Sequence, residues 1–574
     1  MASTAISEDQ DELPLEANFI EQAEYIDTQS FLTLSTEHPD EDGILRKLMG
    51  GGAKLLIGPR GCGKSTLMLK AFHRICSQHP ISTLPVYVNF KLALKVEPLY
   101  SKGANAPFWF KGWLVLKVLE ALHQTFEQCK GLNAPDSLPS RKEIRKLTSK
   151  IESGLTTSGD IQNYTVPNLQ VIIEEILEEN NLHRCILLID DAAHAFSEKQ
   201  QEDFFDFFRA VKTKYIAPKA AVYPGITSHS PSFQVGHDAE QIDAWVRPLG
   251  PDYESFMLDM ARKRLVGTSI EVTEDKYEDI AFLAYASFGI PRAFLGMLRA
   301  IFNNPDSFLN SEGQLLKPKL LELSRQGKDM SHAVYNALVA KVPPLKSYVQ
   351  NGEAIYDAIV SSIKSYNSHR GEDSQALQFG IKKPLDTDLE KVFGFFQYSG
   401  LAMYVGDTSR GENGIFSIYD IHIGDLISSN ALIGKRTKSI GAFLTAIRSP
   451  KHQAWPRTFS NKLIDSAGLK KSSFFLSLPQ CQVCGAERIS SDARFCFNCG
   501  SQLKSASTYE HLSGQDIAVL PISAAMKARI KEHSQMTKVR DILIDNSREQ
   551  LMKIPYIKKT RATTIVGAAE EFVS

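Results

Sequence analysis

The sequence predicts an α/β fold of the P-loop type, in which a parallel sheet lies between helices and smaller, mainly helical domains follow. Three observations support this prediction. A glycine-rich motif at 58–65 lies between an apolar strand and an amphipathic helix. A second apolar stretch, 185–191, ends in two adjacent acids. Apolar residues at helical spacing fill 198–214, and a further strand is expected at 219–228. Strands that alternate with helices indicate a parallel sheet.

The motif at 58–65 fits G-x-x-x-x-G-K-[ST], the phosphate-binding loop of nucleoside triphosphatases. Its glycines let backbone N–H groups converge on phosphate oxygens, and the following helix adds its positive dipole end. We expect Lys64 to reach the β- and γ-phosphates and Ser65 to ligate Mg²⁺. The alternative is a glycine-rich turn that contains Lys-Ser by chance. The expected nucleotide-binding residues of this loop are Gly58, Pro59, Arg60, Gly61, Cys62, Gly63, Lys64, Ser65 and Thr66.

The apolar strand at 185–191 ends in Asp190 and Asp191. In phosphoryl transfer, one acid holds Mg²⁺ and a second polar group orients the attacking water. We therefore expect Asp190 to be the magnesium residue (Walker B) and Asp191 to be the catalytic acid. Apolar strands that end in Asp also occur by chance in α/β proteins.

The order of these segments resembles that of AAA+ ATPases, from about residue 31 to 304. The resemblance implies that the strand at 219–228 ends in the sensor 1 residue, which is Thr227 or Ser228. It also implies that Arg292, in Gly289-Ile290-Pro291-Arg292, is the sensor 2 arginine at a helix start beside the γ-phosphate. Arginine suits this role because its planar fork stays charged and pairs with phosphate oxygens. The alternatives are a surface Ser/Thr turn and a capped helix with a solvated arginine.

Within the AAA+ superfamily the segment is most similar to the origin-recognition (ORC) initiator group, particularly bacterial ORC-like ATPases of unassigned role. Gly58–Gly61, Val86–Asn89 and Gly289–Arg292 carry this closer resemblance. Two departures stand out. Asp191 replaces the usual Glu and is one methylene shorter, so we expect hydrolysis to be slow or partner-dependent. A helical insert at about 96–181 separates the two motifs, and no arginine finger can be assigned.

After the predicted lid (251–330), helices are expected at Asn351–Tyr366 and Asp386–Gln397. Strands at Gly400–Val405 and Ile415–Tyr419 flank the polar turn Gly406–Gly414, a pattern that indicates a β-hairpin. Helices followed by such a hairpin resemble a winged helix, expected here over 331–430. Winged helices bind DNA or dock proteins, and the sequence leaves both open.

The segment 431–480 carries nine basic residues and one acid, although the net charge of the chain is −1. Aromatic residues are interleaved, so the segment can track phosphates and stack bases. The alternative is a solvated linker with a small satellite core. The basic residues are Lys435, Arg436, Lys438, Arg448, Lys451, Arg457, Lys462, Lys470 and Lys471.

Two C-x-x-C knuckles with eleven residues between them predict a zinc ribbon at 481–503. With four protein ligands the zinc would be structural, because no position remains for a catalytic water. A redox dithiol pair or disulfides are the alternatives. The expected zinc ligands are Cys481, Cys484, Cys496 and Cys499.

The tail, 504–574, contains Leu551–Lys558, which resembles the hairpin of a helix–hairpin–helix. In that DNA-binding element two hairpin glycines let the backbone approach phosphate, whereas Tyr556 and Lys558 stand at those positions here. Side-chain charge from Lys558, Lys559 and Arg561 could substitute. A protein-docking helix pair is the alternative.

Composition limits the function classes further. The 574 residues suffice for three or four domains. Since no apolar run approaches about 18 residues and the first 30 residues are acidic, we expect no membrane span and no signal or transit peptide. Single, scattered cysteines in the nucleotide-binding half suit a reducing cytosol, which predicts a cytoplasmic protein. These cysteines are Cys62, Cys76, Cys129 and Cys185.

Together these features predict an AAA+ base domain at 31–250 and an ATP- and Mg²⁺-dependent switch that acts on DNA through the basic segment and the tail. The role would be that of an initiator, or a role in mobile elements or phage defence, with a homo-oligomer or an effector protein as further partner. The alternative is a nucleotide-gated protein-interaction scaffold without DNA contact. The sequence shows no nuclease or helicase motif set.

Overall fold

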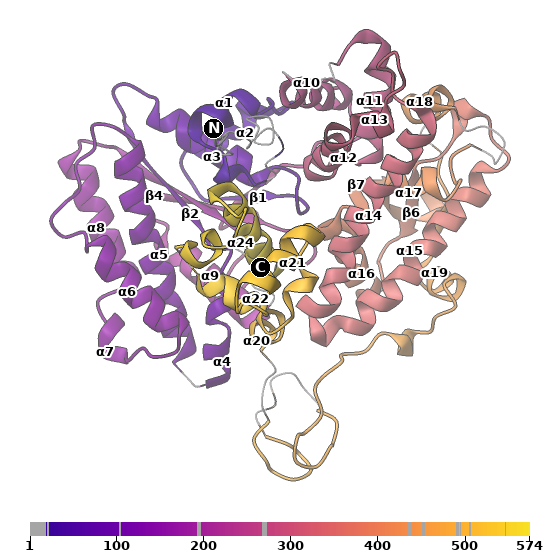
Figure 1. The fold of residues 1–574 in the computed structure, drawn as a ribbon. Coiled ribbons are helices and arrows are strands. Elements are labelled where there is room, and N and C mark those ends of the chain that lie inside the picture. The colour runs from indigo at the N-terminus through magenta and orange to yellow at the C-terminus, as the bar shows by residue number, and fades with distance from the viewer. Residues whose placement is uncertain are drawn as a thin grey trace, which may run out of the picture.

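The computed structural model of the protein describes residues 19, 22–102, 105–191, 197–266, 272–433, 439–449, 454–488, 493, 495–503, 507–545 and 547–573. Its first half is built on a five-stranded parallel sheet with the strand order β2-β3-β4-β1-β5 (Figure 1). The predicted α/β fold is therefore confirmed. The strands are β1 (Lys54–Ile57), β2 (Thr83–Asn89), β3 (Arg184–Asp190), β4 (Ile216–Val222) and β5 (Glu240–Asp243).

Helices cover both faces of the sheet. Alternate residues of β3 point to opposite sides, as strand geometry requires. Ile186 and Leu188 join the core with the P-loop helix α3, whereas Leu187 and Ile189 join the core with α5 and α9. The helices outside the insert are α1 (Thr28–Leu34), α2 (Glu41–Met49), α3 (Lys64–Cys76) and α9 (Glu198–Val211).

The insert expected at about 96–181 is helical. Its longest helix, α5, carries the apolar residues predicted there and packs against β2 and α9. The insert contains α4 (Pro98–Lys102), α5 (Ala106–Gln128), α6 (Arg141–Glu152), α7 (Ser158–Ile161) and α8 (Val166–Glu179). One sequence interpretation was wrong: Cys76 and Cys129 are not isolated but form a disulfide between the ends of α3 and α5. They lie 53 residues apart in the chain, and no spacing motif marks such a pair.

A helical lid follows the sheet. It contains α10 (Tyr253–Leu265), α11 (Tyr277–Ala286), α12 (Pro291–Asn303), α13 (Pro305–Phe308) and α14 (Lys317–Lys341). Because α14 is continuous across residue 330, the expected boundary between lid and winged-helix-like domain falls inside a helix.

The second domain contains a four-stranded sheet with the order β7-β8-β6-β9. Its strands are β6 (Gln378–Lys382), β7 (Ala402–Ser409), β8 (Ile415–Ile421) and β9 (Arg457–Thr458). Its helices are α15 (Lys346–Asn367), α16 (Thr387–Ser399), α17 (Ile423–Ser428), α18 (Ile440–Arg448) and α19 (Ser460–Ser466). The two helices and the hairpin expected from the sequence are all present.

The hairpin turn is shorter than predicted, because residues 406–409 belong to β7. Asp407 accepts a hydrogen bond from Ser417 Oγ at 2.9 Å and forms an ion pair with Lys383. Polar residues fit this strand since β7 is the exposed edge of the sheet.

The segment 431–480 is not a linker throughout. Its described part supplies α18, α19 and β9, and β9 pairs with β6. Trp455 is buried against Phe416 and Ile418, which forms the small satellite core that was one alternative. Lys435, Arg436, Lys438 and Lys451 lie outside the described residues.

The tail returns to the P-loop domain. It contains α20 (Thr508–Ser513), α21 (Ala524–His533), α22 (Val539–Ile544), α23 (Glu549–Met552) and α24 (Lys559–Val573). Figure 1 shows these helices, in yellow, over the middle of the molecule between the sheet domain and the helices α14 and α16. Ile530, Ile565 and Ala569 belong to the same hydrophobic cluster as α5 and α9. In the described part of the chain, no helix is long and apolar enough to cross a membrane.

Candidate nucleotide-binding site and metal centre

A cavity lies over the P-loop, between the sheet domain and the lid. Its walls come from the loop itself, from α10 and α12 of the lid, from the segment 22–26 and from the C-terminal helix. The predicted residues Gly61, Cys62, Gly63, Lys64, Ser65, Thr66, Arg60, Asp191 and Arg292 all line it. The fold thus brings together residues that are up to 232 positions apart in the chain.

The P-loop lysine is buried among polar groups of its own loop. Lys64 Nζ donates to the backbone oxygens of Gly58 and Pro59 at 2.7 and 2.9 Å and lies 3.9 Å from the ring centroid of Tyr223. Burial lowers the pKa of Lys64. Gly63, with φ of +100°, precedes the first turn of α3, so the loop enters the helix through a conformation that glycine adopts readily.

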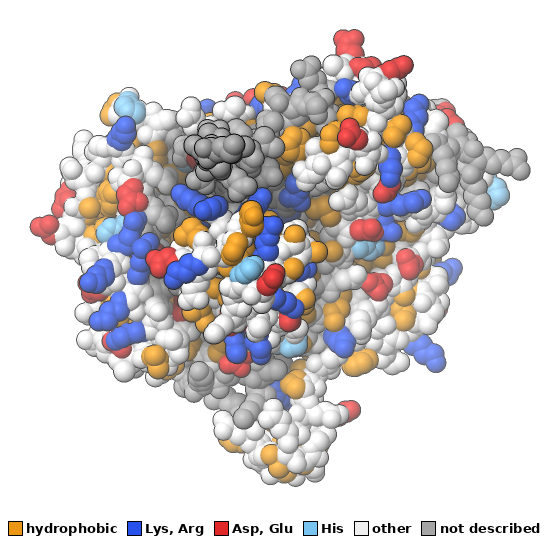
Figure 2. Space-filling view, viewed as in Figure 1, with side chains coloured by type: hydrophobic (Ala, Val, Ile, Leu, Met, Phe, Trp, Pro, Cys, Tyr) orange, Lys and Arg blue, Asp and Glu red, His pale blue; other side chains and the backbone are white. Residues whose placement is uncertain are grey.

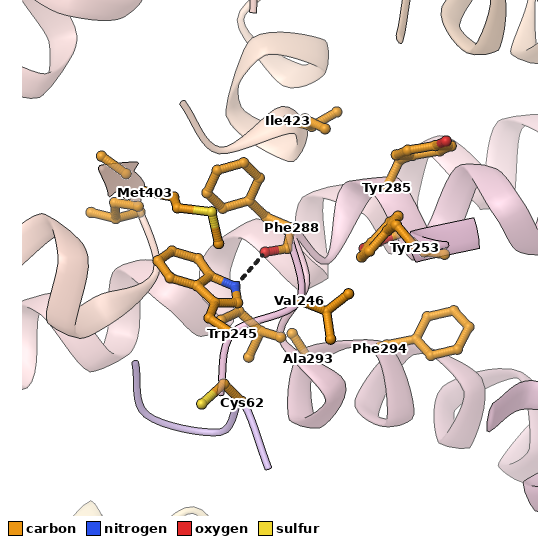
Figure 3. Packing of buried hydrophobic residues seen from close by; sticks show 14 of the residues in the cluster. Cys62, Trp245, Val246, Tyr253, Tyr285, Phe288, Ala293, Phe294, Met403 and Ile423 are labelled. Atoms are coloured by element: carbon orange, nitrogen blue, oxygen red, sulfur yellow. Dashed lines mark hydrogen bonds between the residues drawn. The ribbon is translucent and has the colours of Figure 1, made fainter. Parts of the chain in front are cut away.

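The loop also contacts the lid and the second domain. The Arg292 backbone N–H donates to Gly61 O at 3.3 Å, and the Arg60 N–H donates to Tyr398 O at 3.1 Å. Figure 3 shows Cys62 in the cluster with Trp245, whose Nε1 donates to Phe288 O at 3.2 Å. The lid and α16 are therefore both hydrogen-bonded directly to the phosphate-binding loop.

Asp190 ends β3 and is almost fully buried, and unlike Asp191 it is not among the residues that line the cavity. Tyr87 Oη donates to Asp190 Oδ2 at 2.7 Å, and the side chain of Ser65 is also hydrogen-bonded to Asp190. Burial and the adjacent Asp191 raise the pKa of Asp190 to about 7. A buried carboxylate beside a serine hydroxyl is the oxygen donor set that Mg²⁺ prefers, so Ser65 and Asp190 fit this ion.

Asp191 follows Asp190 with a φ of +50°, a conformation that turns its side chain out of the strand direction. Tyr223 Oη donates to Asp191 Oδ1 at 2.8 Å, and Asn89 Nδ2 lies 3.4 Å from Oδ2. Asn89 also donates to Glu24 Oε2 at 2.8 Å, which places a second carboxylate on the cavity wall. Asp191 and Glu24 are therefore both positioned by hydrogen bonds from residues at the ends of neighbouring strands.

The end of β4 differs from the expectation. The strand stops at Val222, because Pro224 has no N–H and Gly225 turns the chain with a φ of +74°. Thr227 Oγ1 donates to Tyr223 O at 2.7 Å, within its own turn, and Tyr223 rather than Thr227 lines the cavity. The sensor 1 role of Thr227 stays a prediction. Sequence reasoning missed Tyr223, since a lone tyrosine after a strand matches no motif.

Arg292 lies in the first turn of α12, one residue after Pro291, and its side chain faces the P-loop. Its guanidinium Nη1 forms an ion pair with Glu571 Oε1, and Arg60 Nη2 lies 3.3 Å from the same oxygen. Glu571 belongs to α24, at the far end of the chain. No spacing pattern in the sequence points to this contact.

The cavity also has apolar walls, which include Ile26, Phe31, Leu34, Phe256 and Met260. A cavity with both apolar and cationic walls suits a nucleotide, whose flat base is buried by hydrophobic contact while its phosphates meet lysine and arginine.

The four cysteines of the predicted ribbon converge. Their sulfur atoms all lie within 4.8 Å of one another, with 3.6 Å between Cys481 and Cys499 and 3.5 Å between Cys484 and Cys496. Sulfur atoms around tetrahedral zinc lie about 3.8 Å apart, as follows from Zn–S bonds of about 2.3 Å. Gly485 and Gly500 follow the knuckles with φ of +71° and +66°. The site fits a zinc ion.

A basic and aromatic surface surrounds the hairpin of the second domain. Arg410 lies over Trp455 with 5.0 Å to the ring centroid, and Lys462 lies over Phe459 at 5.5 Å. Arg457, Lys470 and Lys471 are also exposed. Among the described basic residues of segment 431–480, Arg448 pairs with Glu254 at 2.8 Å and Lys471 pairs with Asp386 at 2.6 Å.

The residues of the predicted tail hairpin form a turn between α23 and α24. Tyr556 has a φ of +64°, the left-handed conformation that favours glycine, and its side chain is exposed. Lys558 and Lys559 are exposed as well. Figure 2 shows lysine and arginine side chains gathered on the face formed by the helical insert and the C-terminal helices.

No family model matches the sequence, and no curated protein does. Among solved structures the chain is similar to the ORC1 protein of Aeropyrum pernix in complex with DNA. The identity is 13%, the match covers 70% of this chain and 93% of that one, and the TM-score is 0.29. It is also similar to Cdc6p of Pyrobaculum aerophilum, at 13% identity, 73% and 97% coverage and a TM-score of 0.30. With TM-scores this low, neither likeness carries weight for function, and the proposal below rests on the cavity.

Proposed function

We propose that the chain is an AAA+ switch that binds ATP, hydrolyses it slowly and acts on DNA. The observation that carries the ATP proposal is one cavity in which Lys64, Asp191 and Arg292 converge beside an apolar wall. Lys64 and Arg292 supply positive charge where the phosphates would lie, and Asp191 orients the attacking water. Ser65 and Asp190 would hold Mg²⁺, which neutralises phosphate charge when bound.

The decisive experiment measures ATP binding and ATP hydrolysis for the wild type and Lys64→Ala, with and without double-stranded DNA. We expect wild-type turnover below about 1 s⁻¹, the lower end of typical enzymes, because Asp191 is shorter than glutamate. Lys64→Ala should abolish binding and turnover. Tight ATP binding by Lys64→Ala would refute the assignment of this cavity, whereas binding without turnover in the wild type would identify a switch that does not hydrolyse.

DNA contact is supported by the basic and aromatic surface around Arg410, Arg457 and Lys462. Neutralising two phosphate contacts with Arg457→Ser and Lys462→Ser should make the slope of log affinity against log salt less negative by about 2. The matched control is Lys319→Ser with Arg325→Ser, which removes the same charge from α14. DNA binding that responds equally to both pairs, or to neither, would favour the second candidate, a nucleotide-gated scaffold for an effector protein.

A further inference from the structure

The C-terminal helix places a carboxylate among the cations of the nucleotide cavity. Glu571 Oε1 pairs with Arg292 Nη1 and lies 3.3 Å from Arg60 Nη2. Arg60 Nη2 also donates to the backbone oxygen of Glu571 at 3.0 Å, and Gln22 Nε2 donates to Oε2 at 2.9 Å. Both oxygens of the carboxylate are thus bound, and Glu571 lines the cavity together with the P-loop.

The surroundings keep this carboxylate ionised. Burial alone would raise the pKa of Glu571, but Arg292, Arg60 and Lys91 outweigh it and hold the pKa well below its usual range. Arginine recognises carboxylate and phosphate with the same planar set of donors. Glu571 therefore offers these two arginines the kind of anion that a terminal phosphate would offer.

Contacts with residues 22–25 and with Lys91 fix the end of α24 that carries Glu571. Tyr25 Oη donates to Glu570 Oε2 at 2.6 Å, and Lys91 Nζ lies 3.8 Å from the same oxygen. Gly567 lies against residues 22–25, since a Cβ there would be 2.8 Å from Gln22 Oε1. The segment 22–25 thus holds the last two turns of α24 at the mouth of the cavity.

The opposite end of α24 leads to the exposed hairpin. The helix begins at Lys559, three residues after Tyr556, and its 15 residues span about 22 Å. Because a helix is stiff over this length, a displacement of its Glu571 end also reaches the basic end of the tail, while Ile565 and Ala569 keep the helix on the core of the P-loop domain.

We propose that α24 is an intramolecular competitor of the terminal phosphate: Glu571 holds Arg60 and Arg292 until a nucleoside triphosphate takes them, and the Glu571 end of α24 is then displaced from the cavity. This inference rests on the proposed function, because it requires that the cavity bind nucleotide. It predicts that ATP, but not ADP, displaces the helix, since only ATP carries the γ-phosphate that Arg292 is expected to contact.

The test compares Glu571→Gln with Glu570→Gln in the full chain. Glu570→Gln is the matched control because its carboxylate contacts Tyr25 and Lys91 rather than the two arginines. We expect Glu571→Gln to bind ATP about tenfold or more tightly than the wild type, with ADP affinity changed less than threefold. Glu570→Gln should leave the ratio of the ATP and ADP affinities unchanged. Hydrogen exchange at 559–573 in the wild type should accelerate with ATP and not with ADP.

The outcomes separate the two proposals. If wild type and Glu571→Gln bind ATP equally and α24 stays protected with ATP, competition is refuted while ATP binding stands. Weaker ATP binding by Glu571→Gln would likewise overturn it, since Glu571 would then support the site. If neither protein binds ATP, the proposed function itself fails. Should Glu571→Gln not fold, the hydrogen exchange of the wild type decides alone.

Discussion

At Gly61 the backbone has a φ of +84°, and a Cβ there would lie 3.0 Å from the Cβ of Arg292. The lack of a side chain at Gly61 therefore allows both the turn of the loop and the close approach of Arg292 from the lid. We expect Gly61→Ala to weaken ATP binding by about tenfold or more, because the loop and Arg292 can no longer take their present positions. Calorimetric titration with ATP measures this effect.

Gly131→Ala is the control for this substitution. Its φ of +90° is equally unfavourable for alanine, but no heavy atom lies within 4 Å of the added Cβ. Both variants should lose about 1 kcal/mol of unfolding free energy through backbone strain. Only Gly61→Ala should lose ATP affinity, and an equal loss in both would show that strain rather than the lid contact matters.

At the residue scale the sequence predicted the residues that belong to motifs. Lys64, Ser65 and Asp191 lie together because a P-loop and an acid-ended strand have fixed places in a parallel sheet. Tyr223 and Glu571 could not be predicted, because neither has a characteristic spacing. Their place in the cavity depends on how strand ends and the C-terminal helix meet in space, which a local pattern does not contain.

At the scale of elements, apolar periodicity located most helices and strands, and the misplaced ends have local causes. Pro224 ends β4 early, and the polar residues of β7 favour a turn in the sequence because an exposed edge strand lacks an apolar pattern. The strand β9 has two residues, too few for any periodicity. The prediction for segment 431–480 therefore depended on its charge, although β9 in this segment completes the four-stranded sheet.

Two glycines lie close together where the second domain meets the P-loop domain. A Cβ on Gly394, in α16, would lie 2.8 Å from the Cα of Gly225, in the turn after β4. Alanine usually stabilises a helix by about 1 kcal/mol relative to glycine. We expect the reverse for Gly394→Ala, a loss of about 1–3 kcal/mol, because the added methyl group meets backbone. Chemical denaturation measures the change.

Gly441→Ala provides the comparison, since Gly441 lies in α18 with no heavy atom within 4 Å of the added Cβ. That variant should be as stable as the wild type or up to about 1 kcal/mol more stable. Gly394→Ala that is stabilised to the same degree would show that α16 does not pack on the β4 turn in solution.

At the scale of the whole molecule, the tail, for which the sequence predicts a DNA-binding hairpin or a docking helix pair, packs back on the P-loop domain. Ile565 and Ala569 of α24 share a core with α5 and α9 of that domain. The sequence predicted the helices but not this return, because the apolar face of a tail helix does not specify its partner. The two ends of the described chain, residues 22–25 and α24, thus meet at the nucleotide cavity.

The segment with the four clustered cysteines contrasts with this integration. In Figure 1 the segment 481–503 projects from the body between α19 and α20. None of its described residues belongs to the two large hydrophobic clusters. Zinc binding should therefore fold this segment without stabilising the rest of the chain.

We expect one zinc ion per wild-type chain by elemental analysis and none in a Cys484→Ser and Cys499→Ser double variant, because a tetrahedral thiolate site that loses two ligands releases its metal. Proteases should then cleave within 481–503 faster in the variant. The main thermal transition should shift by less than about 2 °C, which corresponds to at most about 1 kcal/mol for a domain of 150–250 residues. A chelator added to the wild type is the control, since it removes zinc without changing the sequence. A large fall of the main transition in both cases would show that the module supports the core, and a wild-type chain without zinc would leave the four cysteines to redox chemistry.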